Sequence, residues 1–284
     1  MPTSTPDTAS CGAPTQWGLR RSIALVRAFR LEQTDPDHFY RLQAADSVAQ
    51  LERYETVAGK VVVDIGGGAG YFTEALTKSG ARCLLVEPEA ADLDDDGPGD
   101  AAGPDADADA VRRSRHREAV RAGRLAVGRT VAGDGNQLPL PDAVADVAFS
   151  SNVLEHVPAA GRFLDEMVRV TRPGGALYLS FTAWLSPWGG HETAPWHYVG
   201  GERAARRYER RHGRPPKNRF GSSLFACHVG PTLRLARAHP DVEVVDARPR
   251  YYPDWMRFLV EVPGVREIAT WNLLLVLRRR GTPA

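Results

Sequence analysis

The stretch Val61-Val62-Val63-Asp64-Ile65-Gly66-Gly67-Gly68-Ala69-Gly70-Tyr71-Phe72 decides the fold of this chain. Three β-branched residues followed by an acid predict a buried parallel strand that reaches its carboxyl end here. Glycines alternate directly after this strand, and a helical pattern resumes from Phe72 to Thr77. A strand, a glycine turn and a helix form the first unit of a doubly wound α/β sheet, in which ligands bind at the carboxyl ends of the strands.

The spacing of the glycines argues against a dinucleotide as the ligand. A dinucleotide-binding turn needs G-x-G-x-x-G, and with Gly66 and Gly68 its third glycine would fall on Tyr71. The stretch instead reads Asp64-x-Gly66-x-Gly68-x-Gly70. Because a Cβ would hold the backbone away from a ligand, glycines in this pattern indicate that a different cofactor approaches the loop closely.

Composition points to a cytoplasmic protein without a strong net charge. The chain has 284 residues, 43% of them hydrophobic, and can bury a substantial core. Its 36 Lys and Arg residues offset 35 Asp and Glu residues, so no global field attracts nucleic acid or an anionic membrane. The three cysteines show no C-x-x-C spacing, and the longest aliphatic run, 273–277, is too short to span a membrane.

The rest of the sequence alternates short apolar strands with helical periodicity, which is typical of a parallel α/β sheet. Strands are expected at 82–86, 125–132, 146–150, 176–181, 242–245 and 271–277, and helices at 17–30, 35–54, 72–79, 160–171, 202–212 and 224–238. The predicted domains are a disordered tail (1–15), an N-terminal helical cover (16–58), a cofactor-binding α/β core (59–182) with a disordered acidic insertion (91–110), a substrate-side insertion (183–222), and a C-terminal helix with the last strands of the sheet (223–284).

Several motifs follow one another at the spacing of a known family. After Asp64-x-Gly66-x-Gly68-x-Gly70, acids end the second and third predicted strands at Glu87 and Asp134. Arg172-Pro173-Gly174-Gly175 then precedes the fifth strand. From about residue 36 to 182 the chain resembles the class I, Rossmann-like S-adenosylmethionine-dependent methyltransferases of type 11.

Three further stretches, 186–198, 217–225 and 251–253, extend this resemblance to an actinobacterial branch of the family and to nearly all of the chain after residue 36. The resemblance implies a doubly wound, seven-stranded, mostly parallel sheet with N-terminal helices and a substrate-side insertion. It also implies S-adenosyl-L-methionine as the methyl donor.

The same resemblance assigns a set of cofactor-binding residues. Glu87 stands where an acid accepts both ribose hydroxyls, and Asp134 where an acid meets the adenine amino group. Asn152 follows the fourth strand, where the family meets the methionine end of the cofactor. The full predicted set is Asp64, Gly66, Gly67, Gly68, Gly70, Glu87, Pro88, Asp134, Gly135, Asn136 and Asn152.

The loop after the fifth strand carries the candidates for acid–base chemistry. It places His191, Glu192 and His197 among aromatic residues. Methylation of a hydroxyl requires removal of its proton, and histidine titrates in the range suited to a general base. We predict these three residues as catalytic. His191 is the preferred base because Gly189-Gly190 lets the loop approach the cofactor.

Glu155-His156 raises the question of a metal. Some methyltransferases that act on catechol-like substrates or RNA ends carry Glu-x-x-Glu-His here and bind a divalent ion. This chain has Asn152 in place of the first glutamate, which removes an anionic ligand. The sequence therefore predicts no metal.

The predicted function is O-methylation of a small-molecule or glycan hydroxyl, without nucleic acid as partner; the sequence predicts no oligomeric state. Two alternatives stay open, a non-catalytic cofactor-binding partner protein and an RNA methyltransferase that uses the basic segment 203–219. The basic residues of this segment are Arg203, Arg206, Arg207, Arg210, Arg211, Arg214, Lys217 and Arg219.

Overall fold

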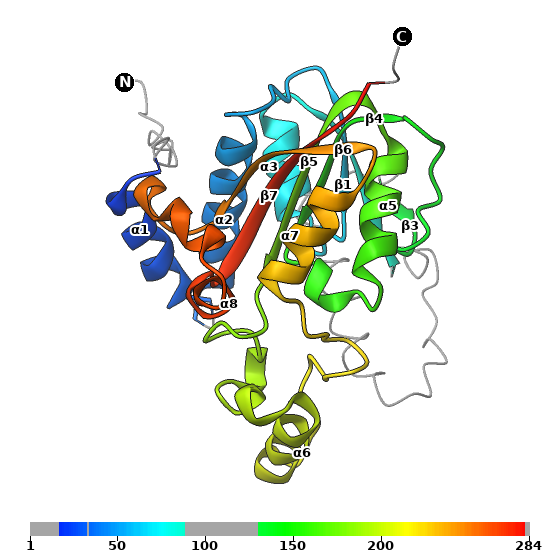
Figure 1. Cartoon of the computed structure of the whole chain (residues 1–284). Helices are drawn as coiled ribbons and strands as arrows, with labels where there is room; N and C mark the ends of the chain where they lie inside the picture. The colour runs from blue at the N-terminus through cyan, green and yellow to red at the C-terminus, as the bar shows by residue number, and fades with distance from the viewer. Residues whose placement is uncertain (1–16, 33, 89–129, 282–284) are drawn as a thin grey trace, which may run out of the picture.

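A computed structural model describes residues 17–32, 34–88 and 130–281 of the chain (Figure 1). The predicted tail (1–15) and acidic insertion (91–110) lie outside the described residues, as does most of the strand expected at 125–132. None of the helices in the described ranges is long and apolar enough to cross a membrane.

The described strands form one seven-stranded sheet with the order β3-β2-β1-β4-β5-β7-β6. All neighbouring pairs from β3 to β5 are parallel, whereas β7 runs antiparallel to both β5 and β6. This topology confirms the expected doubly wound, mostly parallel sheet. The strands are β1 Val61–Ile65, β2 Arg82–Glu87, β3 Thr130–Ala132, β4 Ala145–Ser151, β5 Thr171–Thr182, β6 Val242–Pro249 and β7 Asn272–Arg279.

Helices cover both faces of the sheet (Figure 1). Leu51 of α2 and Leu76 of α3 belong to the apolar cluster on one face, and Met167 of α5 and Leu233 of α7 to the cluster on the other. The α-helices are α1 Leu19–Phe29, α2 Pro36–Leu51, α3 Tyr71–Lys78, α5 Ala160–Val170, α6 Gly201–His212, α7 Val229–Ala238 and α8 Val265–Ala269. Short 3₁₀ helices are η2 Leu154–His156, η3 His191–Thr193, η4 Trp196–Val199 and η5 Asp254–Glu261.

The helix expected to begin near residue 224 begins at Val229 instead. The N–H of Phe225 donates to the carbonyl oxygen of Glu155 over 2.8 Å, and this contact holds the preceding segment outside the helix. The Glu267 carboxylate accepts the Val229 N–H at 2.9 Å and closes the start of α7. Both contacts come from segments distant in sequence, and the apolar periodicity within one segment does not predict such contacts.

The region between the last two strands also differs from the sequence-based prediction. β6 reaches Pro249 rather than residue 245, and η5 and α8 follow where periodicity predicts no helix. Helices as short as η5 and α8 contain too few residues for a helical period to stand out in the sequence.

Arg250 is fully buried where α2 meets the carboxyl ends of β4 and β5. Its Nη1 donates to Ser151 Oγ at 3.0 Å and to Ser180 Oγ at 2.9 Å. Its Nη2 donates to Ser47 Oγ of α2, and Arg21 of α1 donates to the Arg250 carbonyl oxygen at 3.0 Å. Arg250 therefore joins α2 through its guanidinium, and α1 through its carbonyl oxygen, to the edge of the sheet at which a ligand is expected.

Replacing Arg250 with methionine should lower the free energy of unfolding by about 2 kcal/mol or more, because three buried hydroxyl groups lose a charged donor. Chemical denaturation measures the change. Arg234→Met, at an exposed position of α7, is the matched control and should shift the same quantity by less than about 0.5 kcal/mol. Equal stability of Arg250→Met and the wild type would contradict this role.

Candidate functional site

The loop between β1 and α3 is packed at Gly67 and open at Gly68. A Cβ at Gly67 would lie 2.3 Å from an Asp64 carboxylate oxygen and 2.7 Å from Leu85. Gly68 has a φ of +55°, and beyond its chain neighbours no heavy atom lies within 4 Å of the place that its Cβ would take. Gly70, with a φ of +76°, is the N-cap of α3. The open space at Gly68 is where a ligand can approach the backbone.

Asp64 lies beneath this loop and is 1% exposed. Its Oδ2 accepts a hydrogen bond from Thr73 Oγ1 at 2.6 Å, and its Oδ1 is buried without a partner. Burial raises the pKa of the carboxyl to about 7, against the opposing effect of the Thr73 hydrogen bond. Asp64 thus ties the end of β1 to the first turns of α3.

Two acids stand at the carboxyl ends of the strands next to β1. Glu87 ends β2, with the exposed Pro88 after it, and its Oε2 accepts a hydrogen bond from the Gly68 N–H at 3.0 Å. Asp134 follows β3, and its Oδ1 accepts from the backbone and side-chain N–H groups of Asn136 at 2.8 and 3.1 Å. Because β3, β2 and β1 are parallel neighbours, the two acids and the glycine loop share one edge of the sheet.

Asn152 and Gly135 are fixed by contacts that sequence reasoning did not foresee. Asn152 follows β4 with a φ of +58°, and its Oδ1 accepts from Asn272 Nδ2 at 2.8 Å and from Arg250 Nη1 at 3.3 Å. Gly135 packs so closely on Phe163 that a Cβ would lie 2.5 Å from the ring. Arg250 and Asn272 are therefore positioning residues of this edge of the sheet, and neither carries a local sequence signal.

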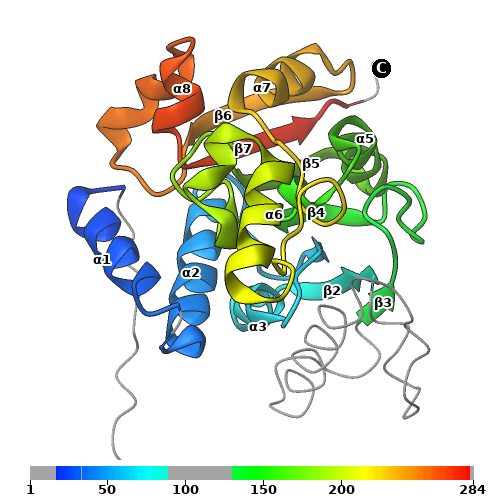
Figure 2. The same cartoon turned by 90° about the horizontal axis from the view of Figure 1, so that it is seen from below.

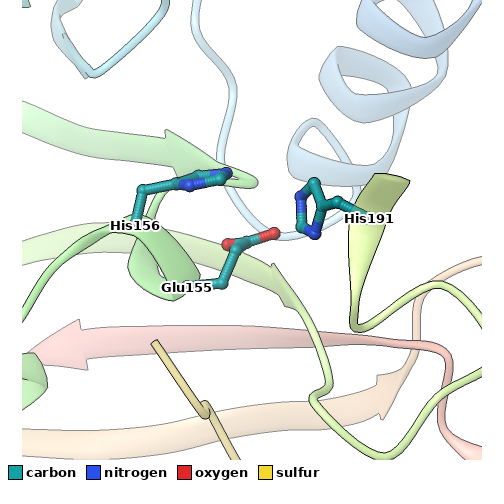
Figure 3. Close-up of side chains that lie close together, drawn as sticks. All are labelled: Glu155, His156 and His191. Carbon is teal, nitrogen blue, oxygen red and sulfur yellow. The ribbon is translucent and has the colours of Figure 1, made fainter. Parts of the chain in front are cut away.

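Glu155, His156 and His191 meet beyond the carboxyl end of β4 (Figure 3). One carboxylate oxygen and one ring nitrogen of each histidine lie within 4.8 Å of one another. The two imidazole rings stand edge to face, with centroids 5.1 Å apart and planes at 74°. Val153, which precedes η2, packs beside the glycine loop: a Cβ on Gly66 would lie 2.7 Å from the Val153 side chain. The cluster and the loop are thus neighbouring parts of one site.

Backbone hydrogen bonds orient the groups of the cluster. Glu155 is 1% exposed, and its Oε1 accepts the Thr182 N–H at 2.9 Å. His156 Nδ1 lies 2.6 Å from the Ser223 carbonyl oxygen. Burial raises the pKa of Glu155 and lowers the pKa of His191, and the neighbouring His156 lowers the pKa of His191 further. His191 is consequently held in its neutral form, which can accept a proton.

The other two predicted catalytic residues lie outside this cluster. Glu192 is exposed, and its carboxylate accepts hydrogen bonds from Asn218 Nδ2 at 3.0 and 3.1 Å. His197 is 1% exposed, and its Nε2 lies 3.1 Å from the Ser186 carbonyl oxygen. The structure therefore groups His191 with Glu155 and His156, whereas the Glu192 carboxylate and the His197 Nε2 make their hydrogen bonds to other groups.

The insertion after β5 presents a basic helix. Seen from below, α6 lies in front of the sheet (Figure 2). The guanidinium of Arg207 lies 3.8 Å from the centroid of the Trp196 ring, and Glu202 and Glu209 offset part of the charge. The exposed arginines of this helix are Arg203, Arg206, Arg207, Arg210 and Arg211.

Relatives of this chain are methyltransferases. Residues 63–179 match the family model described as a methyltransferase domain. A protein of Mycolicibacterium gilvum described as an uncharacterized methyltransferase is 46% identical over 92% of this chain and 94% of its own length. A protein of Mycobacteroides abscessus with the same description is 43% identical over 92% of this chain and 95% of its own length. The chain belongs to the S-adenosylmethionine-dependent methyltransferases.

Solved structures agree with the fold of this methyltransferase. An S-adenosylmethionine-dependent methyltransferase from Mesorhizobium loti superposes with a TM-score of 0.51 at 18% identity, over 82% of this chain and 98% of its own. The cyclase SpnF superposes with a TM-score of 0.50 at 18% identity, over 85% of this chain and 83% of its own. At this identity the likeness concerns the fold alone.

S-adenosylmethionine is the methyl donor of this methyltransferase, and the residues at the sheet edge fit it. The loop offers an approach without a side chain at Gly68, and carboxylate acceptors for hydroxyl and amino groups follow at Glu87 and Asp134. These groups would hold the nucleoside part, while the segment after β4 would face the methionine part. The cofactor supplies a methyl group on a sulfonium centre.

Replacing Gly68 with valine should abolish binding of S-adenosylhomocysteine, measured by calorimetry, because the side chain occupies the open space at the loop. Gly213→Val is the matched control, since Gly213 also has positive φ, +69°, and no heavy atom within 4 Å of its Cβ position. The two variants carry similar backbone strain, so only Gly68→Val should lose the ligand. Wild-type affinity in Gly68→Val would refute the placement of the cofactor at this loop.

Asp64→Asn should change how stability depends on pH. The folded carboxyl has a pKa of about 7 against its ordinary value of 3.8. Its stabilising contribution is therefore complete below about pH 4 and is lost as the pH rises through 7. As the pH rises from 4 to 8, the unfolding free energy of the wild type should fall by a few kcal/mol relative to that of the variant. One pKa unit corresponds to about 1.4 kcal/mol. Parallel pH profiles of the ligand-free proteins in chemical denaturation would contradict the raised pKa.

Proposed function

We propose that this methyltransferase methylates a hydroxyl oxygen of a small molecule or a glycan, and that His191 takes the hydroxyl proton. The observation that supports this proposal most is that His191 lies in one cluster with Glu155 and His156 beside the glycine loop. The cofactor already supplies an activated methyl group, so the chain has to place the acceptor and receive its proton.

The surroundings of His191 support this assignment. Its pKa is lowered mainly by burial, so the ring is neutral at physiological pH and its basic nitrogen is available. Nδ1 lies 3.4 Å from the Gly189 carbonyl oxygen, which can only accept a hydrogen bond, so Nε2 is the nitrogen that receives a proton. The Glu155 carboxylate nearby stabilises the charged ring once the proton has arrived.

The basic face of α6 supports an acceptor that carries an anionic group. Five exposed arginines on one short helix next to the substrate-side loop create a local positive field in a chain of formal net charge +1. A phosphate, carboxylate or sulfate on the acceptor would be drawn to this face. RNA offers the same charges and is the competing acceptor.

Incubation with S-adenosylmethionine that carries a deuterated methyl group tests the proposal. Metabolite, glycan and RNA fractions of a cell extract are supplied separately, and mass spectrometry follows the label. Label on an oxygen of a metabolite or glycan is the expected result. Label in the RNA fraction alone, label on nitrogen or sulfur, or cofactor binding without any labelled product would each overturn the proposed acceptor.

His191→Ala should lower turnover by roughly 10²-fold or more, the usual scale for a lost general base, and should keep the affinity for S-adenosylhomocysteine. His197→Ala is the control from the same loop. Because the His197 ring is buried against the chain, this variant should lose stability more than turnover per folded molecule. Full turnover of His191→Ala across pH 6 to 9 would show that the proton leaves by another route.

A further inference from the structure

The cluster next to the glycine loop presents the ligand set of a metal site. Figure 3 shows the Glu155 carboxylate and the rings of His156 and His191 directed toward one another from η2 and η3. One possible ligand atom from each residue lies within 4.8 Å of the other two. Two imidazoles and one carboxylate are a recurrent three-residue set for divalent transition metals, with further coordination positions left open.

The surroundings of the Glu155 carboxylate are those of a ligand to a cation. Oε1 accepts the Thr182 N–H at 2.9 Å, whereas Oε2 is buried and has no hydrogen-bond partner. The side chain is 1% exposed, so bulk solvent does not reach this oxygen. A buried carboxylate oxygen without a partner costs free energy, and proteins meet that cost with a cation or with a hydrogen-bond donor.

Both histidines are oriented as metal ligands usually are. His156 Nδ1 lies 2.6 Å from the Ser223 carbonyl oxygen, and His191 Nδ1 lies 3.4 Å from the Gly189 carbonyl oxygen. A carbonyl oxygen accepts only, so Nδ1 carries the proton in each ring and Nε2 carries the lone pair. Metal-binding histidines typically donate their second ring nitrogen to a backbone carbonyl or a carboxylate in this way.

We infer that Glu155, His156 and His191 bind one divalent transition metal ion such as Zn²⁺. Nitrogen ligands favour this class over Mg²⁺ and Ca²⁺, which prefer oxygen. Ligand atoms stand about 2.0–2.2 Å from such an ion, so binding would draw the three side chains closer together. Asn152 stands where some methyltransferases carry the first glutamate of Glu-x-x-Glu-His, so that ligand is absent. His191, from a segment distant in sequence, supplies the third ligand.

A bound ion would also make the acceptor hydroxyl easier to deprotonate. This consequence rests on the proposed function. An acceptor hydroxyl at an open coordination position becomes more acidic, because the cation stabilises the oxygen anion. While the ion is bound, His191 is a ligand, and the proton of the acidified hydroxyl leaves to solvent; proton transfer to His191 describes the metal-free protein. Turnover that requires the metal, and that a chelator abolishes, separates this arrangement from proton transfer to His191.

Calorimetric titration with Zn²⁺ tests the site on full-length protein that has been dialysed against a chelator. No cofactor or acceptor is present, so the result does not depend on the proposed reaction. One ion per chain with a Kd of about 10 µM or tighter is the expected result. Co²⁺ provides a second readout through the visible absorption that nitrogen and oxygen ligands give this ion.

Glu155→Gln, His156→Ala and His191→Ala should each weaken binding by about 100-fold or more. Glu155→Gln keeps an acceptor for the Thr182 N–H and tests the charge alone. His228→Ala is the matched control, because His228 Nδ1 lies 3.8 Å from the Glu267 carboxylate in a second histidine–carboxylate pair. No binding at millimolar Zn²⁺, or binding that survives in all three cluster variants, would overturn the inference.

Discussion

The hydrogen bond between Thr73 and Asp64 holds the glycine loop to the sheet, and the other parts of the site take their positions from that loop. Gly67 lies over the Asp64 carboxylate with no room for a side chain. The Gly68 N–H reaches Glu87 on β2, and Gly66 rests against Val153 at the entrance to η2. One buried acid thereby sets the geometry on both sides of β1.

Two buried carboxylates near this edge of the sheet are incompletely paired, and both belong to the site. Asp64 Oδ1 and Glu155 Oε2 are buried without a hydrogen-bond partner. Such groups lower the stability of the ligand-free protein, because burial disfavours the charged form of a carboxylate. Their concentration beside a glycine loop is typical of a site arranged for a ligand at the expense of stability.

The sequence predicted what local patterns encode. The β-branched run before Asp64, the glycine spacing and the acids at Glu87 and Asp134 placed the sheet edge correctly, because strand, turn and helix signals lie within a few residues. His191 and His197 share one loop, and the sequence prefers His191 only because of the glycines beside it. That His191 joins Glu155 while His197 lies against the Ser186 carbonyl oxygen is set by folding and not by a local pattern. Arg250 carries no local signal, since its partners come from α2, β4 and β5.

The fold alone does not decide the reaction, because the cyclase SpnF shares it. We propose that the glycine loop and the Glu155–His156–His191 cluster form one active site. A crystal structure with S-adenosylhomocysteine tests this most directly. We expect the ribose on Glu87 and the cofactor sulfur facing the cluster. A ligand bound elsewhere, or one whose sulfur points away from His191 and Glu155, would contradict it.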